Sequence, residues 1–225
     1  NHVLCRYNVL DLGYGTGSST IAWEEAGHNV VGVDWVTDAT IIGDWTDPET
    51  WKRIRQHGPY HFIWFSPDCS IFSMANMRWG PNIRDGVPIS ERAIREVRGI
   101  EYVLENIAQL RPKLGWIMEN PRALMRIMDF TRKLHRATVT YCQYGDSSRQ
   151  KPTDLFGQLP ESFRPRECRA GSPCHVRAPR GSQSGTQGMS REDAGEIPYG
   201  LSLEIYLSAI ESDGLSIPIL EDFYE

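Results

Sequence analysis

A strand, a glycine-rich loop, a helix and a second strand follow one another at the start of the chain. Residues 8–12 are mostly apolar and predict a strand, and three alternating glycines come directly after them. A Ser-Ser pair then opens a predicted helix over 18–26, and residues 29–34 predict a second strand that ends in Asp34. Strands joined through a helix lie parallel in one sheet, so the chain is predicted to fold as an α/β protein.

The glycine loop predicts a ligand site. Glycine lets the backbone approach a ligand closely, and the helix N-terminus offers unpaired N–H groups. The spacing is G-x-G-x-G rather than the G-x-G-x-x-G of dinucleotide sites, and no Walker lysine follows. Two interpretations stay open, a nucleoside-bearing cofactor without a pyrophosphate or a degenerate dinucleotide site.

Acidic and aromatic residues follow the next two strands. Asp34 is placed to accept hydrogen bonds from ribose hydroxyls, and Trp35 could stack on an adenine ring or lie in the core. Asp44, after a short strand over 40–42, could accept from an adenine amino group or serve only in a turn, and Trp45 adjoins it. We include all four side chains in the candidate cofactor site.

A cysteine follows the most apolar strand of the chain. Residues 62–65 predict a short buried strand, and Pro67 ends its ladder because proline has no N–H to donate. Cys69 comes next, at the carboxyl end of the strand, where ligands of open α/β sheets bind. A lone cysteine is often a small buried apolar residue, but a thiol with a lowered pKa is a nucleophile.

A carboxylate and an amide follow the next buried strand, over 115–118. Glu119, Asn120 and Pro121 would face the same crevice as Cys69 if the two strands are neighbours. Alternatively, they start a turn before a helix predicted over 122–134, with Glu119 as a favourable charge at its N-terminus.

The remaining segments predict scaffold. A long loop over 74–89 suggests a lid. Residues 90–110 have a capping-type start and helical apolar spacing, residues 137–144 resemble a strand, and 201–210 predict a closing amphipathic helix.

Charge is distributed unevenly and suggests a domain organisation. Residues 149–180 contain seven basic and three acidic side chains, whereas 190–225 contain one basic and nine acidic ones, within a net charge of −5. The basic segment is either a face for polyanions or a solvated loop. We predict a catalytic domain over 1–157, a recognition insert over 158–191 and a C-terminal helix with an acidic tail over 192–225.

Cysteine usage indicates a reducing, cytoplasmic setting. The five cysteines are odd in number and scattered, which disfavours a disulfide framework. No C-x-x-C pair exists, so no metal site is predicted, although Cys168, Cys174 and His175 could bind zinc with a fourth ligand from elsewhere. No apolar run is long enough for a membrane helix, and the first residues do not have the charged-then-apolar pattern of a signal peptide. Because the sequence begins at Asn1, we expect an initiator methionine or a longer N-terminus to have been removed.

Taken in order, these motifs resemble the DNA cytosine-5 methyltransferases, especially compact phage-like members, over nearly the whole chain. Pro67-Asp68-Cys69 with Phe72-Ser73 resembles the nucleophile motif, Glu119-Asn120-Pro121 resembles Glu-Asn-Val, and Ser147-x-Arg149-x-Lys151 resembles Gln-x-Arg-x-Arg. The first loop resembles the cofactor loop of the family, with the residues Asp11, Leu12, Gly13, Tyr14, Gly15, Thr16 and Gly17.

The resemblance implies a class I S-adenosylmethionine-dependent methyltransferase fold, a Rossmann-like sheet with helices on both faces and a small irregular insert. It implies S-adenosylmethionine as cofactor, with Pro67 also in its site, and cytosine-containing DNA as partner of a monomeric enzyme. The catalytic residues it implies are Cys69, Glu119, Asn120 and Arg149. Cys69 would attack C6 of a flipped cytosine, Glu119 would act at N3, Asn120 would hold Glu119, and Arg149 would contact O2 or a phosphate.

Three departures from the family pattern bear on function. Gly13 stands where the family has phenylalanine, and Asp68 stands where it has proline, which places a negative charge beside the thiol. Ser147 and Lys151 replace glutamine and arginine. Two alternatives therefore stay open, a class I methyltransferase that acts on RNA or a small molecule and a catalytically inert DNA-binding relative.

Overall fold

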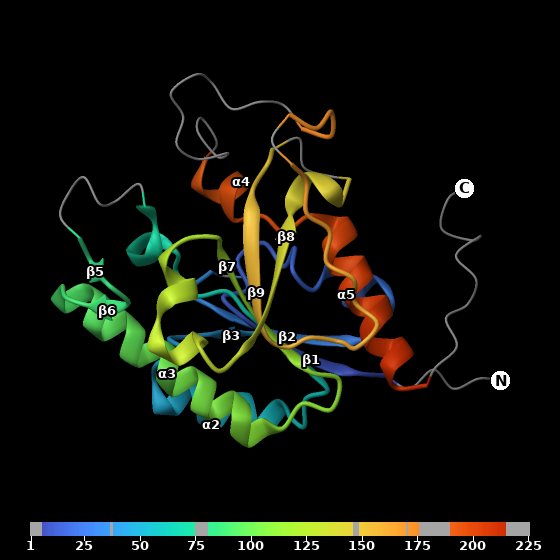
Figure 1. Ribbon diagram of the computed structural model, residues 1–225. Coiled ribbons are helices and arrows are strands. Elements are labelled where there is room, and N and C mark those ends of the chain that lie inside the picture. The colour runs from blue at the N-terminus through green and yellow to red at the C-terminus, as the bar shows by residue number, and fades with distance from the viewer. Residues whose placement is uncertain are drawn as a thin grey trace.

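Seven strands form the central sheet in the computed structural model, which describes residues 6–36, 38–74, 81–145, 149–169, 171–175 and 190–214 (Figure 1). The strands are β1 (Asn8–Leu12), β2 (Asn29–Asp34), β3 (Ile41–Ile42), β4 (Phe62–Phe65), β7 (Trp116–Pro121), β8 (His135–Thr140) and β9 (Pro152–Gln158). A separate hairpin consists of β5 (Ile83–Arg84) and β6 (Val87–Pro88).

Helices connect these strands. The α-helices are α1 (Ile21–Glu25), α2 (Pro48–His57), α3 (Glu91–Leu110), α4 (Arg191–Gly195) and α5 (Tyr199–Ser212). Short 3-10 turns also occur in the described residues, namely η1 (Ser70–Phe72), η3 (Leu124–Ile127), η4 (Asp129–Thr131) and η5 (Tyr141–Gln143).

The order of strands in the sheet is β3-β2-β1-β4-β7-β9-β8. The first five are parallel, whereas β9 runs antiparallel to both β7 and β8. The direction of winding reverses between β1 and β4, since β1 pairs with β2 on one side and with β4 on the other. In such sheets the carboxyl ends of the strands at the reversal open into a crevice.

Both faces of the sheet are buried. In β4, Ile63 and Phe65 contribute to one core, whereas Phe62 and Trp64 contribute to the other. Helices α2 and α3 cover the first face and α1 and α5 cover the second (Figure 1). A strand buried on both faces is apolar throughout rather than alternating, which is why β4 is so apolar. The predicted α/β sheet with helices on both faces is confirmed.

Side chains cap the two best-defined helices. The hydroxyl oxygen of Ser90 accepts from the backbone N–H of Ala93 at 3.1 Å and starts α3, as the sequence predicts. The Asp47 carboxylate accepts from the N–H of Glu49 at 3.0 Å and starts α2. The sequence analysis missed α2, although an acid followed by proline is a typical N-terminal signal.

The predicted helix over 122–134 is wrong. The segment forms the turns η3 and η4, and Met125 of η3 and Met128 between the two turns enter the core. The hydroxyl group of Thr131 lies 2.8 Å from the carbonyl oxygen of Met125 and 2.9 Å from that of Met128. These bonds give the backbone an alternative to an α-helical ladder, so the apolar residues are buried through tight turns instead.

Other predicted boundaries also differ. The strand predicted over 115–118 continues to Pro121, and the one predicted over 137–144 ends at Thr140, where η5 begins. In the loop predicted over 74–89, residues 75–80 lie outside the described part, but β5 and β6 form a hairpin around Asp85-Gly86, both with positive φ. Asp-Gly is a typical sequence for such a turn.

The sequence analysis missed β9, and the domain division stays a prediction. Proline, aspartate and glycine are unfavourable in a central strand, yet β9 contains Pro152, Asp154 and Gly157. In the predicted insert over 158–191, Gln158 is the last residue of β9, and the described residues after it have no helix or strand until α4 begins at Arg191; 170 and 176–189 lie outside the described part.

A buried carboxylate explains how Asp154 is accommodated in β9. Arg126 of η3 donates to it twice, from Nε at 2.9 Å and from Nη2 at 2.7 Å, and the hydroxyl of Thr138 in β8 donates at 2.8 Å. The side chain of Asp154 is 1% exposed, so its charge depends on these three donors.

We predict that Arg126→Met lowers the free energy of unfolding by about 3 kcal/mol, because it leaves a buried carboxylate without its counter-ion. The matched control is Arg132→Met, whose partner Asp129 is on the surface, and it should cost less than about 1 kcal/mol. Urea unfolding of the two variants measures the difference. Equal losses would contradict this account of the buried pair.

Candidate functional site

The candidate site lies where β1, β4 and β7 end side by side. Leu12 pairs with Phe65, and Phe65 pairs with Met118, so the segments that follow these three residues lie at the same edge of the sheet. The glycine motif follows Leu12 and the cysteine motif follows Phe65, whereas Glu119, Asn120 and Pro121 are the last residues of β7. The parallel register therefore brings the three sequence motifs to one edge of the sheet.

Positive φ angles shape the glycine loop. Gly13, Gly15 and Gly17 have φ of 85°, 53° and 76°, in the region that favours glycine. A Cβ on Gly13 would lie 2.5 Å from the carbonyl oxygen of Ser66, the residue after β4. Gly13 therefore lets the loop approach the cysteine segment closely, and a phenylalanine at this position would be strained. Tyr14 packs beside Gly17, and Thr16 is exposed.

Asp11 lies beneath the loop rather than on its surface. Its carboxylate is fully buried and accepts from the hydroxyls of Ser19 and Thr20 at 2.5 and 2.8 Å, which ties β1 to the start of α1. Burial raises the pKa of Asp11 to about 7, against the lowering effect of these hydrogen bonds. Its Oδ1 has no hydrogen-bond partner among the described residues, which leaves an acceptor under the glycine loop.

The ends of β2 and β3 contribute the other predicted cofactor residues. Asp34 accepts from the N–H of Gly15 at 2.8 Å, and Trp35 next to it is 68% exposed. The Oδ1 atom of Asp44 accepts from the N–H of Thr46 at 2.7 Å. Trp45 is partly buried and packs edge-on against Phe65 of β4, with ring centres 5.3 Å apart. Trp45 thus packs against the sheet, whereas Trp35 faces solvent.

The cysteine loop is fixed from both sides. The side-chain amide of Asn120 in β7 donates to the carbonyl oxygen of buried Pro67 at 3.2 Å. The carboxylate of Asp68 accepts from the N–H of Ser70 at 2.9 Å, which starts the turn η1. Cys69 sits between these anchors with an exposed side chain.

Arginine pairs with the unusual acid beside the cysteine. Arg92, in the first turn of α3, donates to Asp68 at 3.0 Å and to the hydroxyl of Ser70 at 2.6 Å. Asp68 therefore has a structural explanation, because it links the cysteine loop to α3. Its charge still acts on the neighbouring sulfur.

The surroundings of Cys69 disfavour the thiolate. Desolvation raises the pKa of Cys69, and the charges of Glu119 and Asp68 raise it further. The ammonium group of Lys151 acts in the opposite direction and lowers the pKa of the thiol. The chain alone thus holds Cys69 mainly as the neutral thiol at neutral pH.

Glu119 is buried and held in one orientation. Its carboxylate accepts from the hydroxyl of Tyr141 in η5 at 3.0 Å. Burial raises the pKa of Glu119, although Lys151 and hydrogen bonds from Tyr141 and Ser66 lower it. A carboxyl group with a raised pKa can carry a proton and give it to a neighbour.

Lys151 is the residue of the site whose role the sequence analysis did not identify. It is buried, its Nζ lies 4.4 Å from the ring centre of Tyr141, and it donates to the carbonyl oxygen of Ala194 in α4 at 2.6 Å. The sequence signal that could have identified Lys151 is its position, which matches the last cation of Gln-x-Arg-x-Arg. Arg149 is half-buried two residues earlier, before β9.

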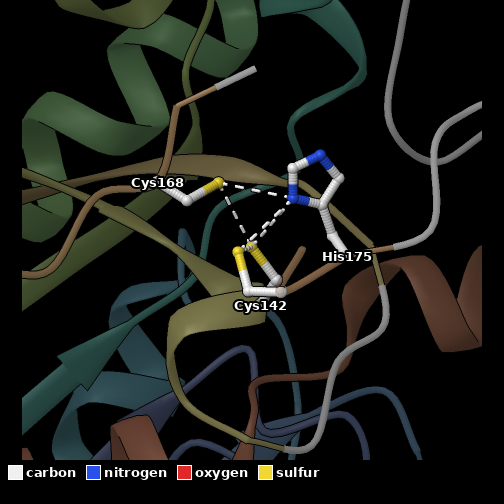
Figure 2. Close-up of side chains that lie close together, drawn as sticks. Cys142, Cys168 and His175 are labelled. Atoms are coloured by element: carbon white, nitrogen blue, oxygen red, sulfur yellow. Dashed lines mark hydrogen bonds between the residues drawn. The ribbon is translucent and has the colours of Figure 1, made fainter. Parts of the chain in front are cut away.

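A second cluster lies beyond the site. Cys168, Cys174 and His175 converge on Cys142 of η5, the fourth residue that sequence reasoning could not supply (Figure 2). Cys142 is distant from the others in sequence, so no spacing motif includes it.

Comparisons with known proteins bear on the fold. The sequence matches no family profile and no curated protein sequence. Among solved structures, the methyltransferase EhMeth of Entamoeba histolytica superposes with a TM-score of 0.50 at 10% identity, over 74% of this chain and 58% of that one. The chain has the fold of the class I methyltransferases.

Two further structures are similar at lower scores. A mutant DNMT2 of Spodoptera frugiperda gives a TM-score of 0.45 at 16% identity, over 77% of this chain and 56% of that one. The Dnmt2 methyltransferase of S. pombe gives 0.46 at 13% identity, over 72% and 51%. The chain thus spans a little over half the length of the structures it matches.

No helix in the described ranges is both long and apolar enough to cross a membrane.

We predict that Asp68→Asn lowers the pKa of Cys69 and speeds alkylation of this thiol a few-fold at pH 8, because it removes a nearby negative charge. Lys151→Met should slow alkylation for the opposite reason. The rate is measured with iodoacetamide over a range of pH by mass spectrometry of the peptide that contains Cys69. Asp44→Asn is the matched control, and an equal shift in it would contradict the assignment.

Proposed function

We propose that this chain is an S-adenosylmethionine-dependent methyltransferase that modifies C5 of cytosine in DNA through a covalent bond from Cys69. The observation that carries the proposal is the juxtaposition of three motifs on a class I methyltransferase fold. Cys69 lies in the loop after β4, the buried carboxyl group of Glu119 belongs to the adjacent strand β7, and the glycine loop approaches the residue after β4 at Gly13.

The residues around the glycine loop fit the cofactor. The positive-φ glycines leave room for a ligand against the backbone, Asp34 is placed for ribose hydroxyls, and exposed Trp35 offers a face to adenine. The unpartnered Oδ1 of Asp11 supplies an acceptor on the inner side of the loop. When bound, S-adenosylmethionine supplies an electrophilic methyl group.

A thiol is needed because C5 of cytosine is too electron-poor to attack a methyl donor. In the proposed reaction the Cys69 thiolate adds to C6, forming a C–S bond and making C5 nucleophilic. After methyl transfer, a base removes the C5 proton, the electron pair reforms the C5–C6 double bond, and the C–S bond breaks. Because the resting thiol has a raised pKa, Lys151 is the nearby cation that favours the thiolate.

Glu119 is suited to act on the cytosine ring together with Cys69. Burial raises the pKa of Glu119 and so favours the protonated form, which can donate to N3 while negative charge develops in the ring. The hydroxyl of Tyr141 fixes one carboxylate oxygen. Asn120, whose amide holds the carbonyl of Pro67, keeps the cysteine loop in register with Glu119. Arg149 is proposed to contact O2 or a phosphate.

DNA is the substrate that we favour. The segment over 149–180, with seven basic and three acidic residues, is suited to phosphates, and it begins at the site. A base stacked in a duplex cannot reach Cys69 and the buried Glu119 together, so it must be flipped out or presented in a single strand. Transfer of labelled methyl groups to duplex DNA, single-stranded DNA, RNA and free nucleotides, assayed in parallel, tests the substrate class. Greater transfer to RNA or nucleotides would overturn this part of the proposal.

We predict that 5-fluorocytosine DNA forms a covalent adduct at Cys69 in the presence of S-adenosylmethionine, because fluorine cannot leave as the C5 proton does. Cys69→Ser should give no adduct and no methyl transfer, yet bind the cofactor with unchanged affinity in calorimetry. Adduct formation is measured by denaturing electrophoresis and peptide mass spectrometry. Full methyl transfer by Cys69→Ser would exclude the mechanism.

We predict that Glu119→Gln slows methyl transfer by about 10²- to 10⁴-fold, because glutamine keeps the shape and the acceptor for Tyr141 but carries no acidic proton. Cofactor affinity should change little. The matched control is Glu91→Gln on the exposed first turn of α3, which should retain the full rate. Loss of cofactor binding in Glu119→Gln would show that Glu119 belongs to the cofactor site instead.

A further inference from the structure

We propose that Cys142, Cys168, Cys174 and His175 bind a structural zinc ion. One ligand atom from each, the three Sγ atoms and Nδ1 of the histidine, all lie within 4.8 Å of one another. Figure 2 shows the labelled side chains pointing toward a common centre. They come from two segments of the chain, the turn η5 and residues 168–175, so no single stretch of local sequence brings them together.

The distances match a tetrahedral metal site. Bonds of about 2.3 Å from zinc to sulfur and about 2.0 Å to nitrogen place two sulfurs about 3.8 Å apart, and sulfur and nitrogen about 3.5 Å apart. The Sγ of Cys142 is 3.3 Å from that of Cys168 and 3.7 Å from that of Cys174. The Nδ1 of His175 lies 3.8, 3.7 and 3.5 Å from the sulfurs of Cys142, Cys168 and Cys174.

The donor set selects zinc and a structural role. Three thiolates with one imidazole are a common zinc set, and four protein ligands leave no open position for a substrate. Two side-chain amides point N–H groups at the sulfurs, Gln143 at Cys174 over 3.0 Å and Gln150 at Cys168 over 3.3 Å. Donors of this kind stabilise negative charge on metal-bound sulfur.

A metal would replace a hydrophobic core in this part of the chain. In the described residues 159–169 and 171–175, Phe163 is the large apolar side chain that is buried, Leu159 is partly buried, and the backbone is irregular. So short a segment cannot support itself through apolar burial. Coordination to Cys142, which is 6% exposed, would fasten it to the end of β8.

The site also adjoins the proposed catalytic residues. Cys142 directly follows Tyr141, which bonds to Glu119, and Gln150 directly precedes Lys151. The ion would thus fix the turn that orients the carboxyl group. This consequence rests on the proposed function, whereas zinc binding itself does not.

We predict one zinc ion per chain when the full chain is purified without chelators, measured by plasma mass spectrometry. X-ray absorption should give three sulfurs and one nitrogen around the ion. Cys142→Ser and His175→Ala should each lower the zinc content at least tenfold, and two variants are used in case one fails to fold. Cys69→Ala, which removes a thiol outside the cluster, should keep the full content.

Removal of zinc by a chelator should lower the midpoint of thermal unfolding, and added zinc should restore it. A folded, metal-free protein whose cluster thiols all react freely, or one that contains a disulfide within the cluster by mass, would overturn the proposal. Because metal content and unfolding are measured without substrate, a failure here is distinguishable from a failure of methyl transfer.

Discussion

The parallel pairing of β4 with β1 on one side and β7 on the other is the constraint on which the site depends. It aligns the ends of three strands, so that residues more than 100 positions apart in sequence leave the sheet at one edge. The close approach of Gly13 to Ser66 then joins two of the loops, and the bond from Asn120 to Pro67 joins the third. The rest of the molecule, with a core on each face, keeps this edge in register.

Charge balance sets the reactivity that the site can have. Desolvation and two acids raise the pKa of the Cys69 thiol and one buried lysine lowers it, while Arg92 donates to Oδ2 of Asp68, one of the two acids. A thiol in these surroundings is protected from indiscriminate reaction. Under the proposed function, its activation would depend on the positive charge that arrives with the cofactor and on exclusion of water by the substrate.

Local signals explain what the sequence could predict. The strand before the glycine loop, the apolar strand before Cys69 and the capped helix that begins after Ser90 were all predictable, because each is determined by its own residues. The helix over 122–134 was wrong because the hydroxyl of Thr131 bonds the carbonyl oxygens of Met125 and Met128 and holds tight turns, and β9 was missed because the charge of its Asp154 is compensated by Arg126, a residue outside the strand. The roles of Cys142 and Lys151 depend on partners that are distant in sequence, so no local motif identifies them.

The hydrogen bond from Lys151 to Ala194 has a consequence for how substrate binding would affect the candidate site under the proposed function. Lys151 precedes the predicted recognition insert and Ala194 follows it. The side chain that lowers the pKa of the Cys69 thiol is therefore held by the backbone that follows the insert. Under the proposed function, a substrate that moves this backbone on binding would also move the ammonium group of Lys151, and with it the effect of that charge on the pKa of the Cys69 thiol.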